Sequence, residues 1–99
     1  MIGKYDIVST SPHQVSATLG NEVVLLELQA GTYFGVNDVG TAVWKYLQQP
    51  RHVSDVIAYV VNQYEVPIDR AESEILGFLQ NLADKGLVVV ERGSKLQTP

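Results

Sequence analysis

The first third of the chain alternates between apolar and polar residues, the pattern of half-buried β-strands. Val15, Ala17 and Leu19 occupy alternate positions, and Leu26 and Leu28 repeat the same period. Turn-forming pairs separate these runs. We therefore expect an antiparallel meander of three strands, at Gln14–Leu19, Glu22–Gln29 and Thr32–Val36, with turns at Gly20-Asn21 and Ala30-Gly31.

Three later segments carry apolar residues at helical spacing, each with a stripe that would face a core. In the last of them, Ile75 lies at the centre of a stripe formed with Ala71, Phe78, Leu79 and Leu82. We expect helices at about Asp38–Gln48, Ser54–Tyr64 and Asp69–Lys85. Their expected caps are Asn37, Ser54, a capping box of Asp69 and Glu72, and Gly86 at the last C-terminus.

These elements predict an α+β fold of the winged helix-turn-helix type, since a short strand at Leu87–Glu91 follows the last helix. The three-stranded N-terminal sheet comes first, then the three helices, then this strand. We expect a flexible arm over residues 1–12, one domain over residues 13–91 and a flexible tail over residues 92–99. A short extended piece at residues 5–8 of the arm stays open as an alternative.

Composition limits the chain to one small domain, because its 99 residues include 45% hydrophobic residues. The absence of cysteine excludes disulfides and thiolate metal sites. No apolar run approaches the roughly 20 residues that cross a bilayer, and the N-terminus lacks the hydrophobic region of a signal peptide. We therefore expect a cytoplasmic protein without a membrane partner.

The charge pattern argues against nucleic acid as a partner. The formal net charge is −4, and the third predicted helix, which would read DNA in a winged helix, carries four acidic residues against two basic ones. A phosphate backbone would repel this helix. A winged-helix DNA-binding regulator remains as an alternative because of the predicted element order alone.

No arrangement of residues points to catalysis. The two histidines, His13 and His52, lie in the arm and in a loop, and neither belongs to a nucleophile or metal motif. Glu72 and Glu74 are two residues apart on a helix and so point in different directions. We expect no enzymatic activity, no metal and no cofactor.

The third predicted strand suggests a binding edge instead. As the last strand of a meander it carries Tyr33 and Phe34 without the lysine or proline that commonly protects an edge. Leu76, at about 100° from Ile75, lies at the rim of the third helix. Two interpretations follow. Either Leu76 with Glu72, Gln80 and Ala83 forms the wall of a peptide channel beside this strand, or Leu76 packs on the second helix and the arm or last strand covers the edge.

The stretch from Leu26 to Trp44 resembles the PqqD-like family. The family pattern is an L-x-L strand, a glycine turn, an aromatic strand that ends in an aliphatic-Asn pair, and a Gly and a Trp in the first helix. These positions are Leu26, Leu28, Gly31, Tyr33, Val36, Asn37, Gly40 and Trp44. The resemblance extends from about Val15 to Glu91.

The resemblance implies a non-catalytic recognition protein that binds the leader of a ribosomally made precursor peptide by strand addition, between the third strand and the third helix. It is most similar to the stand-alone proteins of lasso peptide clusters, which deliver the precursor to a leader peptidase, a cysteine protease, before a cyclase acts. A peptide chaperone that serves a radical enzyme in quinone cofactor biosynthesis is the alternative. The expected peptide-binding residues are Leu26, Leu28, Thr32, Tyr33, Phe34, Gly35, Val36, Asp69, Glu72, Ile75, Leu76, Leu79, Gln80 and Ala83.

Overall fold

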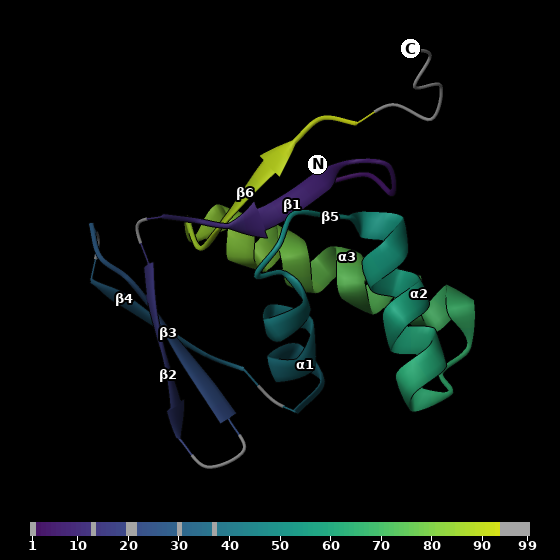
Figure 1. Ribbon diagram of the computed structural model, residues 1–99, viewed down its shortest axis with the longest axis horizontal. Helices are drawn as coiled ribbons and strands as arrows, with labels where there is room; N and C mark the ends of the chain where they lie inside the picture. The colour runs from purple at the N-terminus through teal and green to yellow at the C-terminus, as the bar shows by residue number, and fades with distance from the viewer. Residues whose placement is uncertain (1, 13, 20–21, 30, 37, 94–99) are drawn as a thin grey trace.

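The computed structural model describes residues 2–12, 14–19, 22–29, 31–36 and 38–93 (Figure 1). The elements run β1 (Ile7–Thr10), β2 (Gln14–Leu19), β3 (Glu22–Glu27), β4 (Thr32–Val36), α1 (Asp38–Tyr46), β5 (Arg51–His52), α2 (Val53–Tyr64), α3 (Ile68–Asp84) and β6 (Val88–Glu91). The strands form two antiparallel sheets, ordered β2-β3-β4 and β5-β1-β6. In Figure 1 the first sheet stands at one end of the helices and the second runs beside α3.

The predicted meander is present in the first sheet. Strand β2 pairs with β3 from Gln14 opposite Glu27, and β3 pairs with β4 from Val23 opposite Val36. Strand β3 is two residues shorter than expected, and Gly31 in the following turn has a φ of 68°, which glycine adopts without a steric penalty. The predicted turn at Gly20-Asn21, and Ala30, lie outside the described residues.

The second sheet adds two strands, β1 and β5, to the predicted elements. Residues 7–10, assigned to an arm from their sequence, form the central strand β1, which pairs with β6 over its whole length and with β5 at Ile7 and Val8. The Val8 side chain is fully buried, and the N–H of Ser11 donates to the carbonyl of Leu87 at 3.0 Å. The last strand therefore completes a sheet with the N-terminal segment and leaves the first sheet as a separate unit.

The start of α2 is not capped by a side chain, contrary to the expectation for Ser54. The helix begins at Val53, so Ser54 already lies in the first turn. The N–H groups of Val53 and Ser54 donate to the carbonyls of Asp6 and Lys4, at 2.9 and 2.8 Å. The N-terminal segment thus satisfies the exposed donors of this helix.

The predicted capping box of α3 is also absent. The helix begins at Ile68 after Pro67, without a side-chain cap, and Glu72 forms an ion pair with Lys4 at 3.4 Å. The predicted C-terminal cap is confirmed. Gly86 has a φ of 74°, its N–H donates to the carbonyl of Ala83, and the N–H of Leu87 donates to that of Leu82. These two bonds are those of a Schellman motif.

A single hydrophobic core joins both sheets to the three helices. The first sheet contributes Val23, Leu25 and Val36, and α1 contributes Val43 and Trp44, as expected for the tryptophan. The other large side chains that are fully buried in the core are Val8, Leu47, Val53, Val56, Leu79, Leu82 and Leu87. Because α1 starts two residues after β4, the packing of this helix fixes the position of the β4 strand.

Candidate functional site

Strand β4 has an open edge. Within the described ranges it pairs with β3 on one side and with no strand on the other. The two segments that were the candidates for covering it, the N-terminal arm and the last strand, pair with each other as β1 and β6. The backbone groups along the outer side of Thr32–Val36 are therefore available to another polypeptide strand.

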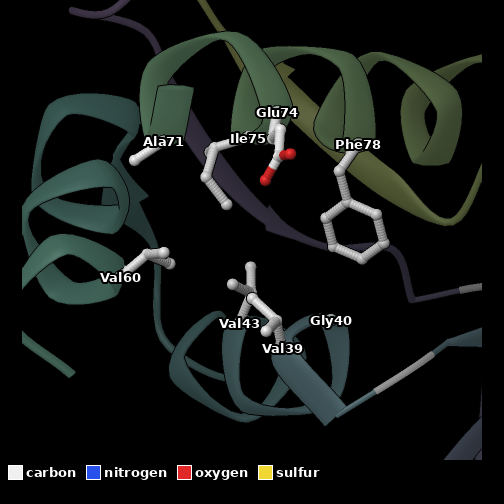
Figure 2. Close-up of a pocket in the computed structure, with 8 residues that line it drawn as sticks. All are labelled: Val39, Gly40, Val43, Val60, Ala71, Glu74, Ile75 and Phe78. Carbon is white, nitrogen blue, oxygen red and sulfur yellow. The ribbon is translucent and has the colours of Figure 1, made fainter. Parts of the chain in front are cut away.

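An apolar cavity of about 290 Å³ lies between α1 and α3 (Figure 2). Figure 2 shows the side chains of Glu74, Ile75 and Phe78 reaching from α3 toward Val39 and Val43 on α1. The complete lining is Val39, Gly40, Val43, Val60, Ala71, Glu74, Ile75 and Phe78. Glu74 is the one ionisable group among these residues, and its carboxylate accepts a hydrogen bond from Arg70 at 3.2 Å.

The cavity lies close to the end of the open strand. Val36, the last residue of β4, is three positions before Val39, the first cavity residue of α1. Three residues of extended chain span at most about 10 Å, so the end of the edge and the wall of the cavity are neighbours. A strand added to β4 would place every second side chain on the buried face of the sheet, which carries Val36.

The expected pocket residues Leu26 and Tyr33 lie on the other face of the sheet. They are direct cross-strand partners. Leu26 follows the buried Leu25 on β3, and Tyr33 lies an odd number of residues before the buried Val36 on β4, so both point away from the buried face. Tyr33 is 72% exposed, and Gly35, which shares its face, is also exposed. Leu28, just beyond β3, is 54% exposed. The side chains of Thr32 and Phe34 lie outside the described part of the chain, although their backbones belong to β4.

The structure divides the predicted residues of α3 between two sides of the helix. Ile75 lines the cavity, whereas Leu79 is fully buried in the core. Glu72 meets Lys4, and the Gln80 side chain accepts a hydrogen bond from the N–H of Ile2 at 3.1 Å. At about 100° per residue, Gln80 is about half a turn and Glu72 about a third of a turn from the centre of the cavity side. The channel wall predicted from them faces the N-terminal segment in this structure.

The remaining α3 candidates follow the same division. Leu76 and Ala83 are half-buried against the core on the side of Glu72 and Gln80, and Asp69 is exposed in the first turn. The sequence interpretation missed Val39, Glu74 and Phe78 as cavity residues. The sequence does place Val39 and Phe78 on the apolar stripes of α1 and α3, which marks them as inward-facing. Helical spacing does not reveal that the two helices leave a cavity between these stripes.

His52 is the one histidine that the structure describes. The His52 ring nitrogen Nδ1 lies 3.2 Å from the carbonyl oxygen of Tyr5, and His13 lies outside the described residues. Across the described ranges, no group of three or more His, Asp or Glu side chains is arranged to hold a metal ion. None of the helices described is both long and apolar enough to span a bilayer.

One family model and two solved structures are similar to this chain. The family model of coenzyme PQQ synthesis protein D (PqqD) matches residues 22–88, about two thirds of the chain. None of the curated sequences compared with the chain matches it significantly. Two solved structures match over most of the chain.

The first of these structures is TbiB1 in complex with the TbiA(beta) leader peptide. It is 36% identical, with a TM-score of 0.75, over 81% of this chain and 93% of that one. The second is lasso peptide synthetase B1 complexed with the leader peptide, with 24% identity and a TM-score of 0.73, over 83% of this chain and 96% of that one. At that identity the second structure supports the fold.

Proposed function

The chain belongs to the PqqD family, and from this premise we propose that it binds the leader segment of a ribosomally made precursor peptide. The observation that carries the proposal is the open edge of β4 beside the apolar cavity between α1 and α3. The 36% identical protein TbiB1, solved with a leader peptide, supports it independently.

The leader binds as a fourth strand of the β2-β3-β4 sheet. Main-chain hydrogen bonds to Thr32–Val36 provide affinity without regard to sequence, and alternate leader side chains provide selectivity. Side chains on the inner face enter the cavity lined by Val39, Ile75 and Phe78. Side chains on the outer face lie beside Tyr33 and Leu26, and the exposed Gly35 lets the leader backbone approach closely.

In this proposal the chain performs no reaction. It holds the precursor in the cytoplasm, where such peptides are synthesised, and presents it to a leader peptidase, with a cyclase acting on the cleaved product. The resemblance of the sequence to the stand-alone proteins of lasso peptide clusters, together with the leader peptide bound to TbiB1, favours this pathway over quinone cofactor biosynthesis. A precursor from the quinone pathway that bound more tightly than a lasso precursor would reverse this preference.

Titration of a fluorescently labelled leader peptide against the Phe78→Ala variant tests the proposal. Phe78 lines the cavity and is half-buried. We expect the affinity to fall about tenfold or more, because burial of a phenylalanine side chain contributes about 1.5–3 kcal/mol.

The matched control is Tyr64→Ala, which removes another aromatic side chain, 40% exposed, at the end of α2. It should bind the leader as the wild type does. Equal affinities for the wild type and Phe78→Ala, with both proteins folded, would exclude the cavity as the leader site.

A further inference from the structure

A second cavity, of about 410 Å³, lies on α1 beside α2. We call it the α1–α2 cavity, and it is lined by Asp38, Thr41, Ala42, Lys45, Tyr46, Arg51 and Tyr59. Thr41 is two residues from Val39 and from Val43, which line the first cavity. Two residues correspond to about 200° around a helix, so Thr41 faces away from these two valines, and the two linings are centred roughly 140° apart around α1. No residue lines both cavities.

The α1–α2 cavity contains a cation held in place by aromatic rings. The guanidinium carbon of Arg51 lies 4.1 Å from the centroid of the Tyr46 ring, and its Nε donates to the Tyr46 carbonyl oxygen at 3.0 Å. Tyr46 in turn stacks on Tyr59, with ring centroids 4.4 Å apart and an angle of 8° between the planes. The guanidinium is therefore pre-organised on a rigid support, which lowers the entropic cost of binding an anion.

The positive charge of this cavity is not balanced by ion pairs. Among the described residues, the ion pairs are Lys4 with Glu72 and Arg70 with Glu74, so neither Lys45 nor Arg51 has a carboxylate partner. Asp38 lies in the same lining, two helical turns from Lys45, or about 10 Å along α1. Two cations against one carboxylate favour a singly charged anion, and Asp38 disfavours a doubly charged phosphate.

Thr41 contributes a buried hydroxyl to this cavity. Thr41 is 7% exposed and lines the cavity, and its Oγ1 has no hydrogen-bond partner among the described residues. Such a group is costly in a folded protein unless something pairs with it. The Oγ1 atom is enclosed in this structure, so a carboxylate held by the arginine would accept a hydrogen bond from it after a rotation of the Thr41 side chain.

We propose that the α1–α2 cavity docks an aspartate or glutamate side chain of the enzyme that acts on the captured peptide. The identity of this partner rests on the proposed function, whereas the carboxylate chemistry rests on Thr41, Lys45 and Arg51. Because the two cavities are lined by different residues, centred roughly 140° apart around α1, the protein binds leader and enzyme simultaneously. Helix α1 is then the rigid element that sets the distance between them.

The test uses the full chain, the leader peptide and the leader peptidase that acts on the same precursor, with both affinities measured by calorimetry. Lys45→Glu changes an exposed residue and should weaken peptidase binding about tenfold or more, without a change in leader affinity. The same charge change at Lys85, beyond the end of α3, is the matched control and should leave both affinities unchanged. An Asp or Glu to Lys substitution in the peptidase that restores binding to the Lys45→Glu variant would identify the docked residue.

Thr41→Val separates a ligand-binding role from a structural one. Valine has the shape of threonine without the hydroxyl, so the variant should melt at a higher temperature yet bind the peptidase more weakly. A lower melting temperature with unchanged peptidase affinity overturns the proposal, as does wild-type affinity in the Lys45→Glu variant or a failure of the wild type to bind the peptidase. A wild type that binds the peptidase but no leader contradicts the proposed function and leaves this docking site supported.

Discussion

Asp6 accepts a hydrogen bond from the backbone N–H of Gly93, 87 residues along the chain, at 3.1 Å. Its other carboxylate oxygen accepts from the N–H of Gly3 at 2.9 Å. The side chain is only 4% exposed, so the two ends of the described chain meet at a buried carboxylate. The hydrogen bond from Gly3 lowers the pKa of Asp6 most, desolvation opposes it, and the bond from Gly93 and the charge of Arg92 lower it further.

Asp6→Asn should destabilise the protein at neutral pH by about 1.5–3 kcal/mol, the range for hydrogen bonds to a charged group. Because the pKa of Asp6 is lower in the folded state than in the unfolded state, its stabilising effect is complete above the unfolded value of about 3.9. The effect is lost as pH falls through the lower folded value. Urea denaturation of both proteins at several pH values should show a difference in unfolding free energy that shrinks below about pH 4. A pH-independent difference would exclude the ionised carboxylate as its cause.

Val8→Ala tests whether the N-terminal segment belongs to the folded domain. The Val8 side chain is fully buried, and β1 supplies the centre of a sheet. We expect a loss of about 1–3 kcal/mol, from the two methyl groups removed and the cavity left behind. Val89→Ala is the control, because Val89 on β6 is 48% exposed. Equal stability of Val8→Ala and wild type in chemical denaturation would return residues 7–10 to the status of an arm.

Two glycines in and after α3 should respond to alanine in opposite directions. Gly86 has a φ of 74°, which costs a residue with a side chain about 1–2 kcal/mol, so Gly86→Ala should destabilise the protein. Gly77 lies inside the helix, and a Cβ there would meet no atom within 4 Å. Gly77→Ala should therefore stabilise the protein by about 0.5–1 kcal/mol. Thermal melting of the two variants gives the comparison, and a shift of both in the same direction would contradict it.

Leu76→Glu distinguishes the two sides of α3. Leu76 is half-buried against the core, about half a turn from the cavity side. We expect a loss of stability of about 1–3 kcal/mol, because a charge replaces a packed apolar side chain, and a leader affinity within about twofold of wild type for the folded protein. Loss of leader binding without loss of stability would instead support the channel wall expected from the sequence.

The leader affinity should depend little on ionic strength. The proposed contacts are main-chain hydrogen bonds and an apolar cavity, so we expect a change of less than about threefold between 50 and 500 mM salt, a range over which screening becomes strong. Docking of a carboxylate at Lys45 and Arg51 should weaken much more over the same range. Tight, steeply salt-dependent binding of duplex DNA would instead favour the winged-helix regulator.

The features that the sequence alone determined are those with local signals. Alternation at Val15, Ala17 and Leu19 identified β2, the helical stripe around Ile75 identified α3, and Gly86 marked the end of that helix. Each of these signals depends on residues that are neighbours along the chain. The motif from Leu26 to Trp44 likewise predicted the family, because a hairpin and the start of a helix are continuous in sequence.

The tertiary structure decided which surfaces meet. Strand β1 pairs with β6, about 80 residues away, and no local turn announces such a pairing. Helical spacing places Leu76 and Phe78 on different sides of α3 but does not say which side faces α1 and which faces Lys4 and Ile2. Periodicity specifies directions around one element, whereas a binding site requires the positions of several elements relative to one another. Those positions are set by the packing of the whole core.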